Sequence, residues 1–260
     1  MQPGLYNLVA MSYEEGRPAL VGRTELTVSN ANVENVTFSA GSIIDITGRV
    51  IPDKPEAENN GEPAANKLAG QVALISARNM PNFGPPARIQ DDGTFKITGV
   101  FQDKVLVTVY GLPADQYIRT VMAGSVDITE TGLDLSAVES APPIEIRLSR
   151  KGATVDGVVL DKDGKPVTGS MVLLLPQPFD PEKPSLPMFR KMATTDQTGR
   201  FSIKAIAPGE YRLYAWESFI SVGDLDPDRL KPYEKNAAGL KLKESAHETV
   251  ELRLNSLPVE

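Results

Sequence analysis

The 260-residue chain contains no cysteine and a single histidine, His247. Without cysteine there is no disulfide framework, no thiolate nucleophile and no cysteine metal site. A catalytic zinc centre needs at least two imidazoles or an equivalent ligand set. A Ser-His-acid triad would have to use His247, which we expect to be an exposed turn residue, and no Gly-x-Ser-x-Gly, P-loop or Gly-x-Gly-x-x-Gly motif occurs. We therefore expect no enzyme activity, no cofactor and no metal.

Positive charge is in the minority, with 27 Lys and Arg against 34 Asp and Glu and a net charge of −7. Nucleic acids and anionic membrane surfaces attract clustered basic residues, so neither is an expected partner. The longest apolar run, from Met171 to Leu175, is far shorter than the roughly 18 residues of a membrane span. The first residues do not have the pattern of a signal peptide. We expect the chain to be cut from a longer protein, with any targeting signal upstream.

A repeat is what the chain does have. Three pairs of matching residues lie 106 positions apart: Gly93 and Gly199, Phe95 and Phe201, Glu145 and Glu251. A constant spacing of this size is typical of a tandem array of whole domains. The start of the chain, Pro3-Gly4-Leu5-Tyr6, matches Pro208-Gly209-Glu210-Tyr211. The predicted domains are residues 1–41, the C-terminal half of an upstream module, 42–150, a divergent module, and 151–260, a complete module.

The local patterns are those of short β-strands. Tyr211, Leu213 and Ala215 alternate with Arg212, Tyr214 and Trp216, which is the period of two expected for a strand. Gly and Pro supply tight turns, as in Asp161-Lys162-Asp163-Gly164. Asp226-Pro227-Asp228 predicts a helix of a turn or two, and residues 52–69 predict a mobile loop. These patterns indicate an all-β sandwich.

The turns and strands of the second repeat resemble a known family. The resemblance rests on these segments: Val155-Asp156-Gly157-Val158-Val159, Asp163-Gly164-Lys165-Pro166-Val167, Thr195-Asp196 with Gly199-Arg200-Phe201, and Ile206-Ala207-Pro208-Gly209-Glu210-Tyr211-Arg212-Leu213. They are similar to the carboxypeptidase regulatory-like domain, a transthyretin-type (prealbumin-like) sandwich. The second repeat matches over its whole length. The first matches loosely, with Gln102-Asp103-Lys104 in place of the Pro-Gly-Glu-Tyr turn. The resemblance implies two tandem antiparallel seven-stranded Ig/prealbumin-like β-sandwiches preceded by a partial third.

The same resemblance implies a non-catalytic accessory role. The expected function is a structural or interaction module, a spacer in a larger bacterial surface or secreted protein. Its expected partners are other domains of that parent protein, and a protein or polysaccharide. The expected location is extracellular, at the cell surface or in the periplasm in association with the outer membrane. The alternative is a carbohydrate-binding accessory module of an enzyme or outer-membrane receptor.

Four aromatic residues are the candidates for a ligand or interface surface. If Tyr211 and Leu213 face the core, Tyr214 and Trp216 face outward, with Tyr110 at the corresponding place in the first repeat and Phe189 in the long loop over residues 176–192. Outward aromatic side chains can stack on sugar rings or mark protein interfaces. Alternatively, Phe179, Met188 and Phe189, or the turn around Tyr233, cover them and form a second apolar cluster.

Three acidic residues leave a choice between a turn and an ion. Asp161, Asp163 and Asp196 carry oxygen ligands of the kind that calcium prefers, but their spacing does not fit a twelve-residue calcium loop. Reversal turns account better for them.

We predict that a chelator leaves the melting temperature of the protein unchanged, because no metal contributes to folding. Thermal unfolding with and without chelator measures this. A fall of several degrees would instead indicate a structural ion near Asp161 or Asp163.

Overall fold

A computed structural model describes residues 2–14, 17–30, 32–37, 40–53, 70–76, 85–180, 189–217 and 227–256. Most of the predicted loop 52–69, Met188 and Asp226 lie outside these ranges. The chain divides into two compact units, the first made of residues 1–51, 65–111 and 120–146 and the second of 52–64, 112–119 and 147–260. Within the described part, no helix is long and apolar enough to cross a membrane.

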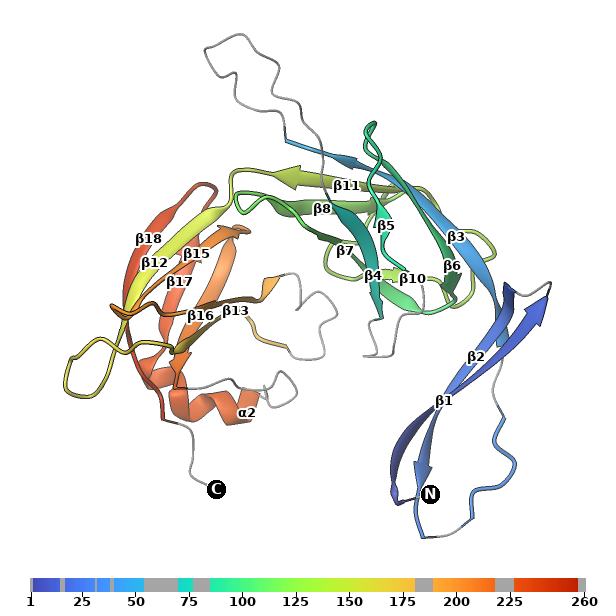
Figure 1. Cartoon of the computed structure of the whole chain (residues 1–260), viewed down its shortest axis with the longest axis horizontal. Helices are drawn as coiled ribbons and strands as arrows, with labels where there is room; N and C mark the ends of the chain where they lie inside the picture. Colours follow the sequence, from blue (N-terminus) through green and yellow to red (C-terminus); the bar gives the residue numbers. More distant parts are fainter. Residues whose placement is uncertain are drawn as a thin grey trace. The chain divides into compact units, whose positions relative to one another are not determined.

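The structure is all-β, which confirms the predicted class (Figure 1). The strands are β1 (Gly4–Glu14), β2 (Arg17–Val28), β3 (Ala40–Ile51), β4 (Gln71–Ser76), β5 (Ala87–Arg88), β6 (Thr94–Phe101), β7 (Lys104–Tyr110), β8 (Tyr117–Ala123), β9 (Val126–Asp127), β10 (Leu133–Asp134), β11 (Ile144–Ser149), β12 (Ala153–Leu160), β13 (Met171–Pro176), β14 (Lys191–Thr194), β15 (Arg200–Ile206), β16 (Gly209–Trp216), β17 (Ala238–Leu242) and β18 (His247–Arg253). A short helix α2 (Pro227–Leu230) runs into a 3-10 turn η2 (Lys231–Asn236).

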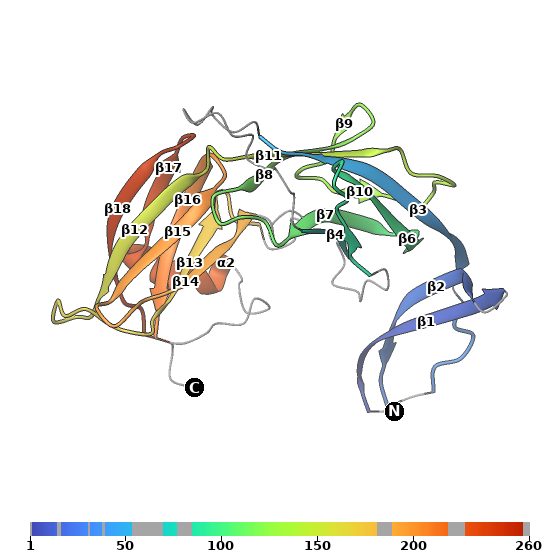
Figure 2. The same ribbon diagram turned by 45° about the horizontal axis from the view of Figure 1, so that its top comes forward.

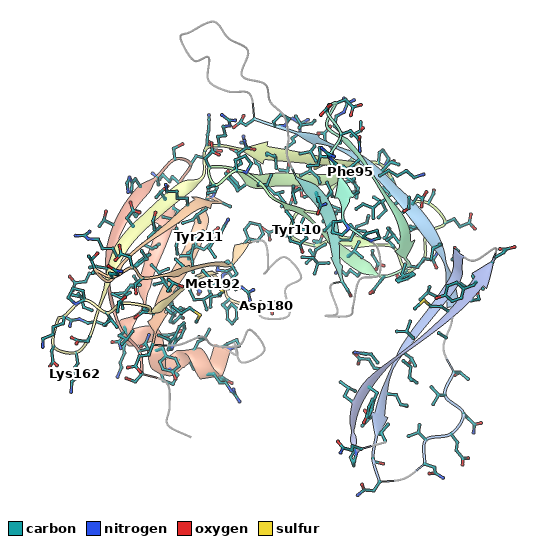
Figure 3. All side chains as sticks on the ribbon, in the orientation of Figure 1. Phe95, Tyr110, Lys162, Asp180, Met192 and Tyr211 are labelled. Carbon is teal, nitrogen blue, oxygen red and sulfur yellow. The ribbon has the colours of Figure 1, made fainter. Side chains whose placement is uncertain are left out.

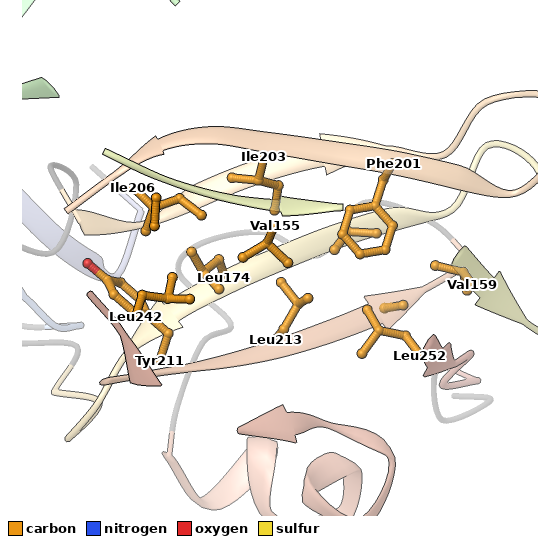
Figure 4. Close-up of a cluster of buried hydrophobic side chains, with 13 residues drawn as sticks. Val155, Val159, Leu174, Phe201, Ile203, Ile206, Tyr211, Leu213, Leu242 and Leu252 are labelled. Carbon is orange, nitrogen blue, oxygen red and sulfur yellow. The ribbon is translucent and has the colours of Figure 1, made fainter. Parts of the chain in front are cut away.

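The second unit pairs two sheets, ordered β15-β12-β18 and β14-β13-β16-β17. Alternate residues of β12 are buried, as the period of two predicts, and they meet β13, β15 and β16 in one apolar core. Figure 4 shows Val155, Phe201 and Leu213 in this core. Strand β13 is apolar at five consecutive positions, all buried, because its second face is also covered. This burial on both faces explains the run that stood out in the sequence.

One strand pair corrects the expectation of purely antiparallel sheets. β12 and β18 pair in parallel, with Thr154 opposite His247 and Leu160 opposite Arg253. Parallel neighbours need a long crossover connection. β12 and β18 are the first and last strands of the unit, so the whole of the intervening chain serves as that crossover.

The first unit repeats this strand order. Its sheets contain β6 and β11 on either side of β3, and the row β10-β7-β4-β5. It differs by carrying β8 and β9 beyond β11 and the hairpin β1–β2 before β3. The predicted domain boundary at Gly41 falls within β3, whereas Lys151 lies between β11 and β12.

A glycine facing a phenylalanine ring recurs in both units. Gly157 is directly opposite Phe201 in the β12–β15 pair, as Gly48 is opposite Phe95 in the β3–β6 pair. A Cβ atom added at Gly157 or Gly48 would lie 2.5 Å from the Cζ atom of the facing ring. Both rings are buried. The ring therefore fills the space that a side chain on the first strand would need.

The hairpin β1–β2 extends from β3 as a two-stranded ribbon. β2 continues the sheet where Leu20, Val21 and Gly22 pair with residues 40–42 of β3. In two views, no other described strand lies over either face of the ribbon (Figures 1 and 2).

We predict that Gly157→Ala destabilises the second unit by about 1–3 kcal/mol, because the new methyl group meets the Phe201 ring and the carbonyl oxygen of Val250. Urea unfolding measures the loss. Gly239→Ala on β17 is the matched control, since no atom lies within 4 Å of the added Cβ there. Equal stability of the two variants would show that the glycine–phenylalanine contact does not constrain the fold.

Candidate functional site

Two of the four aromatic candidates are not on the surface. Trp216 is 0% exposed and Tyr214 is 2% exposed, with their rings stacked at 5.3 Å between centroids. Burial also raises the pKa of the Tyr214 hydroxyl. The candidate surface at Tyr214 and Trp216 is therefore corrected to an interior cluster.

The cover comes from the segment between β16 and β17. Leu230 of α2 is buried in the cluster, and Tyr233 of η2 meets the Trp216 ring edge-on at 5.6 Å. Phe179 packs against the same cluster. Of these residues, the alternative drawn from the sequence had named Phe179 and the turn around Tyr233, whereas Leu230 was not named. Phe189 is half-buried.

Tyr110 differs from its counterpart Trp216. It ends β7, where Trp216 ends β16, yet it is 51% exposed (Figure 3). In the first unit, the segment after β7 forms β8 and β9, which join the opposite sheet. No α2-like helix follows β7 among the described residues, so the outer face of this sheet stays open at Tyr110.

Strand register places two polar residues beside Tyr110. Gln71 on β4 is directly opposite Tyr110 on one side and Arg88 of β5 on the other. Directly opposite residues of neighbouring antiparallel strands share a face. All three are exposed. An aromatic ring, an amide and a guanidinium therefore form one row, which we call the Tyr110 row. Their counterparts in the second unit are Trp216, Met171 and Thr194.

Arg88 also lines an open groove of about 560 Å³. Its other charged lining residues are Arg49 of β3 and Lys96 of β6, and no acidic residue is in the lining. Lys96 is paired with Asp45 at 2.8 Å. In the second unit, Val158, Thr194 and Ser202 stand at the positions of Arg49, Arg88 and Lys96. The cationic character is therefore specific to the first unit and is not a property of the repeat.

The acidic candidates for an ion are used in turns. Asp161 Oδ1 accepts hydrogen bonds from the backbone N–H groups of Asp163 and Lys165, at 2.8 and 2.9 Å. Asp196 Oδ1 does the same for Thr198 and Arg200, and these bonds hold the pKa of Asp196 below its usual range. Within the described ranges, no three acidic or histidine side chains gather as a metal site would require.

His247 begins β18 and pairs with Asp156. Its Nε2 atom lies 2.6 Å from Asp156 Oδ2, on the exposed face of the sheet. The pKa of Asp156 is lowered, first by the Ser202 hydroxyl and then by His247. A hydrolytic triad places the histidine between serine and acid. Here the acid lies between the other two groups, which is not an arrangement that activates the serine.

Comparisons with known proteins give a partial match. Residues 192–224 match the family described as polysaccharide lyase family 4, domain II. No curated protein sequence matches the chain. The match covers a small part of the chain, so it does not establish a family, and the resemblance to the carboxypeptidase regulatory-like domain stays a prediction.

Several solved structures are similar to the chain at low identity. The Bacillus anthracis TIE protein is 10% identical with a TM-score of 0.28, over 96% of this chain and 43% of that one. A protein from Pseudomonas aeruginosa described as carbohydrate-binding is 17% identical with a TM-score of 0.26, over 40% of this chain and 88% of that one. A streptococcal ancillary pilin is 13% identical with a TM-score of 0.29, over 97% of this chain and 76% of that one. Likenesses this weak assign no function.

We predict that Trp216 fluorescence is blue-shifted and resists quenching by iodide, because the ring is fully covered. Tyr233→Ala should increase quenching by opening the edge of the ring. Tyr110→Ala is the control and should leave the emission unchanged. Strong quenching in the unaltered protein would contradict the buried cluster.

Proposed function

We propose that the chain is a non-catalytic structural and interaction module, a set of spacer or accessory domains in a larger bacterial surface or secreted protein. The observation that carries this proposal is how polar side chains of the second unit are used in its turns. Asp161 and Asp196 bind backbone N–H groups of turns, and the Tyr211 hydroxyl donates to the carbonyl of Ala207 at 2.8 Å. These side chains hold turns and strands in place through bonds to the backbone.

The proposed architecture is two tandem seven-stranded Ig/prealbumin-like sandwiches, over residues 42–150 and 151–260, preceded by the C-terminal half of a third over residues 1–41. The shared strand order of the two units supports it. We assign the modules to the carboxypeptidase regulatory-like type. Their proposed partners are other domains of a parent protein located outside the cell, at its surface or in the periplasm near the outer membrane.

A second candidate function is a carbohydrate-binding accessory module, and the Tyr110 row favours it. An exposed tyrosine ring can stack on a sugar, while Gln71 and Arg88 can hydrogen-bond hydroxyl or carboxylate groups. The adjoining cations Arg49 and Lys96 suit a carboxylated saccharide better than a neutral one.

The experiment that separates the two functions is titration of the protein with neutral and carboxylated oligosaccharides, alongside assays for hydrolysis of esters, peptides and glycans. The spacer proposal predicts no turnover and no saturable binding. The second candidate predicts binding to the carboxylated ligand that falls about tenfold or more in Tyr110→Ala and Arg88→Ala, since charge-assisted hydrogen bonds and stacking are lost. Thr194→Ala, at the position of Arg88 in the second unit, is the matched control and should leave any binding unchanged.

A further inference from the structure

The hairpin β1–β2 reproduces part of the second unit in detail. Pro3-Gly4-Leu5-Tyr6 leads into β1 as Pro208-Gly209-Glu210-Tyr211 leads into β16. The Tyr6 hydroxyl donates to the carbonyl four residues earlier at 2.8 Å, as the Tyr211 hydroxyl does. The two pairings have the same register, which these pairs show: Gly4 with Val28, Tyr6 with Leu26 and Leu8 with Thr24, against Gly209 with Leu242, Tyr211 with Leu240 and Leu213 with Ala238.

Among the described strands, β1 has no second neighbour of the kind that β16 has. β16 pairs with β17 on one edge and with β13 on the other, whereas the sheet order ends at β1 beyond β2. The difference shows in burial. Tyr211 and Leu213 are 3% and 0% exposed, but Tyr6 and Leu8 are only half-buried. Met11, at the position of Trp216, is 38% exposed.

The free edge of β1 also has few of the features that prevent an edge strand from pairing with another strand. Native proteins protect edge strands by making them short, placing charges on them or introducing bulges. β1 is 11 residues long, has no charged residue before Glu14 and has its register shift only at Ser12 and Tyr13. The other edge strands of the described sheets are two residues long or carry at least one charged residue, such as Lys96 on β6 and Lys241 on β17.

The strands that pair with β16 and β7 indicate which kind of strand the edge of β1 can pair with. β16 pairs with β13, of sequence MVLLLP, and the corresponding strand β7 pairs with β4, of sequence QVALIS. Both partners run antiparallel, are uncharged and consist mostly of aliphatic residues. We propose that the outer edge of β1 binds an extended, uncharged aliphatic segment as an added antiparallel strand, which in the proposed parent protein is a strand of the third module outside residues 1–260. This deepens the proposed interaction function and rests on it.

The geometry names the atoms that take part. Gln177 N–H donates to the carbonyl of Glu210 at 2.8 Å, so Glu210 points toward β13. Backbone groups alternate between the two edges of an antiparallel strand. At the positions matching Glu210, Arg212 and Tyr214, the backbone groups of Leu5, Asn7 and Val9 therefore face the free edge of β1.

The test is residue-resolved amide hydrogen exchange on the whole chain with a peptide of residues 70–76, flanked by lysine pairs for solubility. Exchange at Leu5, Asn7 and Val9 should slow by about tenfold or more at saturating peptide. A peptide carrying A73P should have no effect, because proline removes a ladder donor. Val9→Pro should abolish the slowing, while Val9→Thr keeps the N–H group and should retain it. Unchanged exchange at Tyr6 and Leu8 would show that the Val9→Pro hairpin still forms.

Three results would overturn the proposal. The first is no slowing in the unaltered chain, and the second is equal slowing in Val9→Pro. The third is protection of the three amides without peptide that rises with protein concentration, which would assign the edge to a second copy of the chain. Failure here leaves the spacer role standing. Conversely, saccharide binding at the Tyr110 row together with strand addition at β1 would remove the spacer role and leave the strand-addition proposal standing.

Discussion

The contact between a glycine on one strand and a phenylalanine ring on its antiparallel neighbour constrains the central strand of each unit. Gly157 and Phe201 lie directly opposite, and the turn before the ring is fixed by Asp196. The ring lies over the backbone of β12, which is the central strand of its sheet and pairs with β18 on its other edge. Gly48 and Phe95 do the same for β3. The same pair therefore recurs at the central strand of both units, where an added Cβ atom would meet both the ring and a backbone carbonyl oxygen.

Equivalent positions in the two units differ in exposure because the connecting segments differ. Trp216 and Tyr110 both end the strand that pairs with an aliphatic neighbour. In the second unit the chain returns through α2 and η2 and buries the ring, while in the first it forms β8 and β9 in the other sheet. Connecting segments often decide which strand surfaces are covered. The Tyr110 row is exposed because the segment that follows β7 does not pack over it.

Sequence patterns predicted the strands and turns well because both are local. Alternation in residues 211–216 fixes which side chains share a face, and Asp-Gly pairs fix reversals. Strand direction is not local, so the parallel pairing of β12 with β18 could not be predicted from alternation. Nor could the row of Tyr110, Gln71 and Arg88, since it depends on register between strands separated by long segments. The burial of Trp216 was left open because a pattern assigns a face without saying what covers it.

The two open surfaces of the first unit have a common origin. Among the described residues, no strand occupies the place beside β1 that β13 has beside β16, and no helix covers Tyr110 as α2 covers Trp216. In the second unit, β13 fills the first of these places and α2 fills the second. The second unit therefore shows which element is missing at each surface of the first unit. The open copy exposes backbone groups of β1 and the ring of Tyr110, which are available for strand pairing or stacking. Interaction is therefore best sought in the first unit and its hairpin.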